Sequence, residues 1–335
     1  MLNERLSSAL SDGDLILPGD GRIAVFAPRA GADLSLLPQD RVQIITGFKP
    51  DHDAFTAAGY ACARAAEGQF AVSLVCLPRA KAQGRALMAQ ACAAAGQGGL
   101  VIVDGQKTDG IESMLRDLRA QGIRPSVQSK AHGKILWFAA QPMPDDWHAR
   151  GPQPVEGGFV TAEGVFSADG IDPASRLLAD SLPENLGARV VDLGAGWGYL
   201  AARLLARDTI TSLDLVEADH TALDCAKRNV TDPRARFHWA DATTWRPAHP
   251  VDSVVMNPPF HTSRAADPDL GRAFIAAAAA MLTGQGRLWM VANRHLPYEA
   301  SLAQHFAEVT ELTGDNRFKI LLAARPLAAK PRIRR

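Results

Sequence analysis

The sequence predicts an α/β protein of two tandem domains, each built on a doubly wound, mostly parallel sheet. Short apolar runs alternate with helical patterns along the whole chain of 335 residues, as in parallel strands covered by helices on both faces. Between the halves, the segment 141–158 holds four prolines and three glycines and shows no periodicity. We therefore expect one domain at 1–142, a linker at 143–156 and a second domain at 157–335.

The individual elements follow from these runs in chain order. In the first half, we expect strands at 22–28, 42–47, 70–78, 100–105 and 134–140, and helices at 79–95 and 111–121. In the second half, we expect strands at 188–196, 211–218, 235–242, 251–259, 286–293 and 318–324, and helices at 219–230, 268–282 and 296–305. Both halves also contain an apolar run, an alanine-rich helix and a GQG turn in the same order. This internal repeat predicts the duplication of one domain.

The composition is that of an ordinary globular protein, with 47% hydrophobic and 21% charged residues. Basic and acidic residues balance at 36 each, so the total charge does not indicate a nucleic-acid partner. The four cysteines have no CxxC spacing, and we expect neither a metal site nor disulfides. The polar start is unlike a secretory signal, and the longest apolar run, at 273–282, is too short to cross a bilayer. We therefore expect a soluble, cytoplasmic protein with no membrane partner.

A glycine-rich turn marks the candidate ligand site of the second domain. The stretch VVDLGAGWGYLAARLL predicts a buried strand, a tight turn and a helix. Gly194, Gly196 and Gly198 permit positive φ and remove Cβ atoms that would block a ligand. The ligand would meet free backbone N–H groups at the start of the helix. Glu217 ends the next strand, where a carboxylate can hold ribose hydroxyls, and Asp241 ends the third strand at the same edge.

Two nucleotide cofactors suit a Rossmann-like edge of this kind, a dinucleotide or S-adenosylmethionine. A dinucleotide carries a pyrophosphate and usually requires G-x-G-x-x-G, whereas this turn reads GxGxG and is preceded by Asp192. A carboxylate at that point disfavours a pyrophosphate and suits a cationic amino-acid moiety. S-adenosylmethionine is therefore the expected cofactor.

The fourth strand of this domain ends in VVMNPPF. Proline has no N–H to donate to a sheet, so the strand stops, and Pro258 holds Asn257 in an extended conformation. This ending resembles the motif of class I methyltransferases that modify planar nitrogens in nucleobases or amides. The resemblance implies that the Asn257 side-chain oxygen and the Pro258 carbonyl accept hydrogen bonds from the acceptor amine. It also implies that Pro259 stiffens the loop and that Phe260 stacks on the flat substrate.

Stretches along nearly the whole chain resemble one family, the bacterial ribosomal RNA guanine-N2 methyltransferases of the RsmC type, with the related RlmG group. The second half contributes GVFSADGIDPASRLL, DLGAGWGYLA, NPPFH, VANRHLPYE and RFKIL, and the first half contributes LPRAKA, VDGQKTDGI and SKAHGK. The resemblance implies a catalytic methyltransferase domain preceded by a degenerate copy of itself. It further implies methyl transfer from S-adenosylmethionine to the exocyclic N2 of one guanine in ribosomal RNA, with the 16S RNA of the small subunit favoured.

The family's site residues carry over to matching positions of this sequence. The implied catalytic residues are Asn257, Pro258 and Phe260. The implied cofactor contacts are Asp192, Gly194, Gly196, Glu217, Asp241, Asn257, Phe166 and Ser167. The implied substrate contacts are Pro259, His261 and Arg317. Trp197 is larger than the residues common in such turns, and we expect its indole to pack against the neighbouring helix.

Several alternatives stay open on the sequence alone. A guanine of 23S RNA, a DNA adenine amine or a protein glutamine amide would be methylated by the same chemistry. A non-catalytic ribosome-binding module or a nicotinamide-dependent oxidoreductase would use the same fold without needing the NPPF motif. The basic tail from Arg317 to Arg335 is either an RNA contact or a frayed terminus. The basic residues of the first domain either dock RNA or form a solvated rim, and they are Arg79, Lys81, Arg85, Lys107, Lys130, His132 and Lys134. We expect a monomer that binds the small ribosomal subunit.

Overall fold

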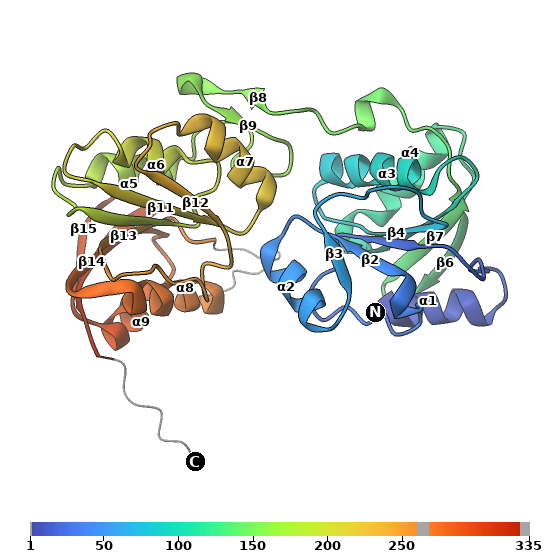
Figure 1. Cartoon of the computed structure of the whole chain (residues 1–335), viewed down its shortest axis with the longest axis horizontal. Coiled ribbons are helices and arrows are strands. Elements are labelled where there is room, and N and C mark those ends of the chain that lie inside the picture. The colour runs from blue at the N-terminus through green and yellow to red at the C-terminus, as the bar shows by residue number, and fades with distance from the viewer. Residues whose placement is uncertain (1, 260–267, 329–335) are drawn as a thin grey trace, which may run out of the picture. The chain divides into compact units, whose positions relative to one another are not determined.

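The computed structural model describes residues 2–259 and 268–328 of the chain. The chain divides into two compact units, residues 1–151 and residues 152–335. Each unit contains its own seven-stranded sheet with helices on both faces (Figure 1). The predicted fold class, two tandem Rossmann-like α/β domains, is therefore confirmed.

The first sheet has the strand order β3-β2-β1-β4-β5-β7-β6. Its strands are β1 (Ile23–Phe26), β2 (Val42–Ile45), β3 (Ala61–Ala63), β4 (Val72–Cys76), β5 (Leu100–Gln106), β6 (Ser126–Lys130) and β7 (Gly133–Ala139). Strands β1 to β5 are parallel, whereas β7 runs antiparallel to both of its neighbours. One face is covered by α3 (Lys81–Ala95) and α4 (Ile111–Ala120), and the other by α1 (Leu2–Ser11) and α2 (Lys49–Ala57) (Figure 1).

The second sheet has the strand order β12-β11-β10-β13-β14-β16-β15. Its strands are β10 (Arg189–Leu193), β11 (Ser212–Glu217), β12 (Ala235–Trp239), β13 (Val251–Met256), β14 (Leu282–Asn293), β15 (Phe306–Gly314) and β16 (Phe318–Pro326). One face is covered by α5 (Pro173–Ser181), α6 (Tyr199–Leu204) and α7 (His220–Asn229), and the other by α8 (Pro268–Met281) and α9 (Tyr298–His305) (Figure 1). A two-stranded ribbon of β8 (Gln153–Pro154) and β9 (Val160–Thr161) precedes this sheet.

The two sheets have the same strand order when each is numbered from its own first strand. In both, the last two strands of the unit form an antiparallel pair at one edge. This shared order agrees with the duplication that the sequence repeat predicts. The predicted helices at 79–95, 111–121, 219–230, 268–282 and 296–305 correspond to α3, α4, α7, α8 and α9.

The sequence patterns do not predict helix α1 or strands β3, β6 and β15, and there is a physical reason for each omission. Helix α1 buries Arg5 together with Leu2, Leu6 and Ala9, so a charged residue interrupts its apolar face. The Arg5 guanidinium is held by Asp104 at the end of β5, with Nε 2.5 Å from Oδ1 and Nη2 2.8 Å from Oδ2. Strands β3, β6 and β15 lie at or near sheet edges and are largely exposed, so they lack the apolar runs of the central strands.

Part of the segment expected as a linker is packed onto the first unit. A short 3-10 helix at Asp145–Trp147 buries Trp147 to 2% exposure in the apolar cluster beside α3. The Arg85 guanidinium of α3 lies 5.3 Å from the centre of the Trp147 ring. A tryptophan buries a large apolar area, which explains why this stretch is ordered despite its prolines.

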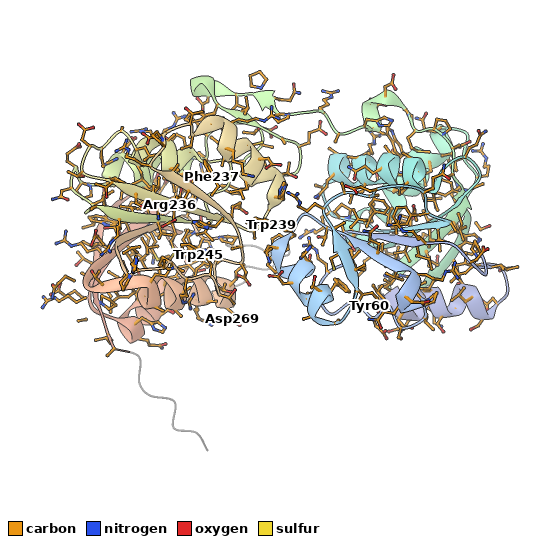
Figure 2. The ribbon with its side chains drawn as sticks, viewed as in Figure 1. Tyr60, Arg236, Phe237, Trp239, Trp245 and Asp269 are labelled. Atoms are coloured by element: carbon orange, nitrogen blue, oxygen red, sulfur yellow. The ribbon has the colours of Figure 1, made fainter. Side chains whose placement is uncertain are left out.

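Strand β12 is one of the two edge strands of the second sheet, and it carries the side chains of Arg236, Phe237 and Trp239 (Figure 2). Trp245 follows the strand, and its ring centre lies 4.7 Å from that of His238. His238 Nε2 is 2.7 Å from the buried Asp214 Oδ1. His238 thus connects β12 with the neighbouring strand β11 and with the loop that follows β12.

Within residues 2–259 and 268–328, no helix is long and apolar enough to cross a membrane. In the same part of the chain, no three His, Cys, Asp or Glu side chains gather as a metal ion would require.

The carboxyl ends of four neighbouring parallel strands meet at one edge of the second sheet. Asp192 on β10 is in register with Leu215 on β11 and Val255 on β13. Glu217 ends β11 in register with Trp239, which ends β12. Ligands of open α/β sheets bind at this edge, so the fold brings the predicted acidic residues and the end of β13 to the expected place.

Candidate functional site

Asn257 follows the last residue of β13, and its side-chain amide is held by two oxygen atoms. Asn257 Nδ2 donates to Asp172 Oδ2 over 3.0 Å and to Ser175 Oγ over 2.9 Å. The next residue, Pro258, is buried, and Pro259 is exposed. The predicted contacts Phe260 and His261 lie outside the described residues.

Asp172 and Ser175 form the start of α5. Asp172 is the N-cap, and its Oδ2 accepts the Ser175 backbone N–H over 2.8 Å. Pro173 occupies the first helical position, where a missing N–H costs nothing. Our sequence reasoning missed both residues, although an Asp-Pro pair is a helix-start signal. Nothing local in the sequence connects them with Asn257, which lies 85 and 82 positions further along the chain.

The backbone N–H groups of Gly194, Ala195 and Gly196 in the glycine turn are occupied within the protein, whereas the free donors expected at the start of α6 (Tyr199–Leu204) stay a prediction. Those of Gly194 and Ala195 donate to the Val216 carbonyl over 2.9 and 3.0 Å. That of Gly196 donates to Glu217 Oε2 over 2.8 Å. A pyrophosphate would therefore find few free donors and two nearby carboxylates, which disfavours a dinucleotide at this turn.

The three glycines of the turn all have positive φ, but they do different things. Gly194, Gly196 and Gly198 have φ of 81°, 55° and 90°. A Cβ on Gly196 would meet no atom within 4 Å. A Cβ on Gly194 would lie 3.2 Å from the Phe274 ring, and one on Gly198 would lie 3.1 Å from Val230. Only Gly196 therefore leaves space open by lacking a Cβ, whereas the other two allow close packing behind the turn.

Asp192 is fully buried at the end of β10, just before the turn. Neither carboxylate oxygen makes a hydrogen bond of normal geometry to any residue that the structure describes. Burial, with repulsion from the Glu217 carboxylate adding to it, raises the pKa of Asp192 from 3.8 to about 7, and the weakly aligned backbone N–H of Ala201 only partly opposes this rise. A cationic ligand group beside this carboxylate would remove the cost of burying it alone. Asp192 therefore fits the cationic amino-acid end of S-adenosylmethionine.

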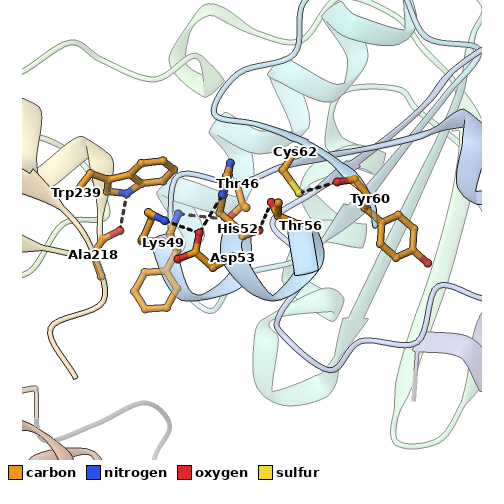
Figure 3. Close-up of polar contacts among 10 residues, drawn as sticks. Thr46, Lys49, His52, Asp53, Thr56, Tyr60, Cys62, Ala218 and Trp239 are labelled. Atoms are coloured by element: carbon orange, nitrogen blue, oxygen red, sulfur yellow. Dashed lines mark hydrogen bonds and ion pairs between the residues drawn. The ribbon is translucent and has the colours of Figure 1, made fainter. Parts of the chain in front are cut away.

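Glu217 connects the glycine turn with the loop after β11. Its Oε2 accepts the Gly196 N–H, and its Oε1 accepts the Asp219 N–H over 2.7 Å. Burial raises the pKa of Glu217 above its ordinary value, although these amide hydrogen bonds oppose the effect. The Trp239 indole donates to the Ala218 carbonyl over 2.8 Å and so joins β12 to the same loop (Figure 3). The Glu217 carboxylate, which could hold ribose hydroxyls, is thus held by one N–H of the glycine turn and by one N–H of the loop after β11.

One pocket joins the glycine turn to Asn257. It is lined by Phe166, Ser167, Asp172, Ser175, Gly194, Ala195, Gly196, Trp197, Tyr199, Leu200 and Asn257. Phe166 lines the pocket and is still 62% exposed, so an apolar ring is presented to solvent there. Ser167 has a φ of 52°, and its hydroxyl donates to the Gly170 carbonyl over 2.8 Å. Residues expected to contact the cofactor and the residue expected to contact the acceptor amine therefore share one pocket.

The indole of Trp197 is buried among aromatic side chains, one of them Tyr199 at the start of α6, and the residue also lines the pocket. Its Nε1 donates to the Phe166 carbonyl over 3.1 Å, and its ring centre lies 5.4 Å from that of Phe159. Asn229 donates to the Trp197 carbonyl over 2.7 Å and to the Val160 carbonyl over 2.8 Å. The turn is therefore tied to the segment before α5, and our sequence reasoning missed the contribution of Asn229.

Six of the predicted site residues that the structure describes do not line this pocket, and they are Asp192, Glu217, Asp241, Pro258, Pro259 and Arg317. Asp192 and Glu217 lie behind and beside the glycine turn, as described above. Asp241 Oδ1 accepts the Thr243 N–H over 2.8 Å and the Thr243 hydroxyl over 2.7 Å, which shapes its own loop. Arg317 is exposed in the turn before β16, where its guanidinium lies 5.0 Å from the Phe318 ring centre. Neither position contradicts a ligand contact, but neither residue belongs to the cluster around Asn257.

The edge of the first unit that corresponds to this site carries different groups. Asp51 of α2 accepts the Ala30 N–H over 2.8 Å and lies 3.4 Å from the Arg29 guanidinium. A side chain of the first unit thus accepts a backbone hydrogen bond from the loop after β1. This arrangement agrees with a copy of the domain that kept the fold and changed its site.

The basic residues of the first unit divide into two groups. Lys81 and Arg85 pair with Asp117 over 3.1 and 2.8 Å, and Lys134 pairs with Glu112 over 3.4 Å. The remaining four are exposed, and they are Arg79, Lys107, Lys130 and His132. The two alternatives for these residues, RNA docking or a solvated rim, stay open, because surface ion pairs of this kind contribute little to stability.

Comparison with known proteins finds a family-model match that lies in the second unit. Residues 156–322 match the family model described as the methyltransferase small domain. Ribosomal RNA small subunit methyltransferase C of Shewanella halifaxensis is 31% identical over 262 residues, which are 75% of this chain and 76% of that protein. The protein of the same name from Hahella chejuensis is 28% identical over 331 residues, which are 91% of this chain and 94% of that protein.

Two further similarities bear on the substrate. Ribosomal RNA large subunit methyltransferase G of Aeromonas salmonicida is 32% identical over 193 residues, which are 55% of this chain and 50% of that protein. Among solved structures, the Thermus thermophilus 16S rRNA N2 G1207 methyltransferase in complex with AdoMet and guanosine matches with a TM-score of 0.78 and 26% identity. This match covers 97% of the present chain and 91% of the Thermus chain.

Proposed function

The chain belongs to the family of ribosomal RNA small subunit methyltransferase C, and from this premise we propose that it methylates the exocyclic N2 amine of a guanine in 16S ribosomal RNA. It is an S-adenosylmethionine-dependent ribosomal RNA methyltransferase. The observation that best supports the choice of acceptor is that Asn257 and the glycine turn line one pocket. The solved relative with AdoMet and guanosine supports the same pairing of cofactor and base.

The residues proposed to hold the cofactor fit its chemistry. S-adenosylmethionine, when bound, supplies a methyl group on a sulfonium centre. The buried carboxylate of Asp192 suits its cationic amino group, and Glu217 suits its ribose hydroxyls. Gly196 leaves space because it has no Cβ. The full set proposed to hold the cofactor is Asp192, Gly194, Gly196, Glu217, Asp241, Phe166 and Ser167, and Asn257 lines the same pocket on the side of the acceptor amine.

Asn257 is proposed to act on the acceptor amine. The lone pair of guanine N2 is delocalised into the ring, so the nitrogen is a poor nucleophile. Hydrogen bonds from N2 to Asn257 Oδ1 and to the Pro258 carbonyl would favour a tetrahedral nitrogen with its lone pair directed at the methyl group. No strong base is required, because the proton can leave the nitrogen after transfer. Phe260 and His261, outside the described residues, are proposed substrate contacts together with Pro259 and Arg317.

The substrate RNA must offer its guanine outside the base stack. Extruding a base costs a few kcal/mol, and less where the base is unpaired. We propose that the small ribosomal subunit or its RNA is the partner, and that the enzyme acts as a monomer in the cytoplasm. The similarity to large subunit methyltransferase G favours a 23S guanine as the second candidate.

A methylation assay tests this proposal. Purified enzyme is incubated with labelled S-adenosylmethionine and with 16S RNA, 23S RNA, or isolated subunits, and the products are analysed by nucleoside mass spectrometry. We expect N2-methylguanosine in the small-subunit pool. Methyl transfer to 23S RNA alone would select the second candidate, and transfer to adenosine or protein would refute the guanine assignment.

A matched pair of variants tests the role of Asn257. Asn257→Ala should lower kcat at least about a hundredfold, because its proposed hydrogen bond forms with the reacting nitrogen. Asn185→Ala is the control, since Asn185 lies before β10 at the opposite edge of the sheet and bonds only to the nearby Gly187 N–H among the interactions described. The control should keep wild-type kcat.

A further inference from the structure

The Asn257 side chain can present only one of its two polar ends to a substrate. Its Nδ2 carries two hydrogens that donate, whereas its Oδ1 accepts. The Asp172 carboxylate offers only acceptors, so Nδ2 must be the end that faces it, at 3.0 Å. The Ser175 hydroxyl is a second acceptor at 2.9 Å. Each hydrogen of the amide therefore has its own acceptor within the protein.

We propose that Asp172 and Ser175 are positioning residues that hold the Asn257 amide so that Oδ1 is the end left for the acceptor amine. This inference rests on the proposed function, in which Oδ1 accepts a hydrogen from guanine N2. In the opposite orientation, the Nδ2 hydrogens would face the N2 hydrogens, and two donors would meet without an acceptor. The charged partner also polarises the amide and makes Oδ1 a stronger acceptor.

The start of α5 holds both positioning side chains in place. Asp172 Oδ2 accepts the Ser175 backbone N–H as well as Asn257 Nδ2, so one oxygen serves the helix cap and the amide. Ser175 is 8% exposed, and its hydroxyl is therefore protected from competition with water. Pro258 restricts the backbone of Asn257, which leaves rotation of the side-chain amide as the main freedom to be controlled.

A charge exchange between positions 172 and 257 tests the proposal. Asn257→Asp sets a second carboxylate against Asp172, and we expect kcat to fall at least about tenfold and Tm to fall by about 2–4 °C. Adding Asp172→Asn supplies an amide that can donate to the carboxylate at position 257, whose other oxygen can still accept from the substrate. We expect this double variant to have a kcat about fivefold or more above that of Asn257→Asp, and to regain most of the lost Tm.

The control uses the same residue type on the same helix. Asp180 is 57% exposed and pairs with Arg203, so Asp180→Asn combined with Asn257→Asp should restore neither kcat nor Tm. The Kd for S-adenosylmethionine, measured by calorimetry, should stay within about threefold of wild type in Asp172→Asn, because the proposed role is on the acceptor side.

Two results would overturn the proposal. One is a double variant whose losses in kcat and Tm are the sums of the single losses, as a purely structural helix cap would give. The other is a Kd that rises about tenfold in Asp172→Asn with an unchanged kcat, which would make Asp172 a cofactor ligand. The Tm cycle needs no substrate, so it judges this proposal even if wild-type enzyme yields no N2-methylguanosine and the proposed function fails.

Discussion

Replacing Asp192 by asparagine should stabilise the cofactor-free protein at pH 8 and weaken its binding of S-adenosylmethionine. The carboxylate is buried, and its pKa is raised from 3.8 to about 7. The folded protein thus holds this proton more tightly than the unfolded chain does. The stability that the proton contributes is complete below about pH 4 and is lost as the pH rises through about 7. Asparagine has nearly the same shape as aspartate and does not ionise, so the variant does not lose this stability as the pH rises.

The size of the effect follows from the pKa. A rise from 3.8 to about 7 lowers the free energy of unfolding at pH 8 by about 4 kcal/mol, at about 1.36 kcal/mol for each pH unit. Asp192 is 0% exposed, so solvent does not screen the effect. The amide that replaces the carboxylate is itself unpaired, which costs about 1–3 kcal/mol. The net gain is about 1–3 kcal/mol, or about 3–10 °C in Tm for a unit of this size.

Thermal unfolding without cofactor, from about pH 5 to about pH 8, measures this gain, and the difference between variant and wild type should grow with pH. Calorimetry at pH 8 should give a Kd for S-adenosylmethionine at least about tenfold above wild type, because the cationic group loses a charged partner. The exposed Asp180→Asn is the control and should change neither quantity. A variant that is no more stable than wild type at pH 8, or whose advantage does not depend on pH, would contradict the assigned pKa of Asp192 as the cause.

Three further outcomes are expected. Glu217→Ala should raise the Kd for S-adenosylmethionine about tenfold or more by calorimetry, whereas Asn257→Ala should leave it within about threefold; equal effects would contradict the separation of cofactor and acceptor roles. Gly198→Ala should lower the free energy of unfolding, measured in urea, by about 2 kcal/mol or more, because the new Cβ would lie 3.1 Å from Val230. Gly196→Ala should lower it by only about 1 kcal/mol, because its Cβ would meet no atom within 4 Å. The wild-type Kd for S-adenosylmethionine should rise as the pH falls below about 7, because the Asp192 carboxyl, with its pKa of about 7, must lose its proton to pair with a cation; a Kd that is unchanged down to about pH 6 would contradict this role.

Much of the fold is predictable from short-range patterns. The central strands are apolar on both faces, as in β10 with Val190, Val191 and Leu193 all buried, and such runs are visible in the sequence itself. Edge strands and short helices are not predictable in this way. Helix α1 is the clearest case, because the buried Arg5 guanidinium is compensated by Asp104, 99 residues away, and by the Ala131 carbonyl, 126 residues away.

The site is predictable in its location and only partly in its contacts. The strand ends, the glycine turn and the two prolines are local features, so Asp192, Gly196 and Asn257 could be identified as candidates. The hydrogen bonds of the turn could not be predicted, because the Gly196 N–H donates to Glu217 on the neighbouring strand. Pairing between parallel strands determines which amides stay free, and the sequence does not display that pairing.

Local sequence is enough to tell that β13 stops before Pro258 and that Asn257 stands at its end, because proline cannot continue a sheet and restricts the residue before it. It also determined that Gly196 can take a positive φ at a strand end. Only the tertiary structure decided which way the Asn257 amide faces, because its partners Asp172 and Ser175 reach it through the packing of α5 against the sheet. A side-chain amide has a donor and an acceptor of nearly equal size, so its orientation depends on the charge and hydrogen-bonding groups around it, and these come from distant parts of the chain.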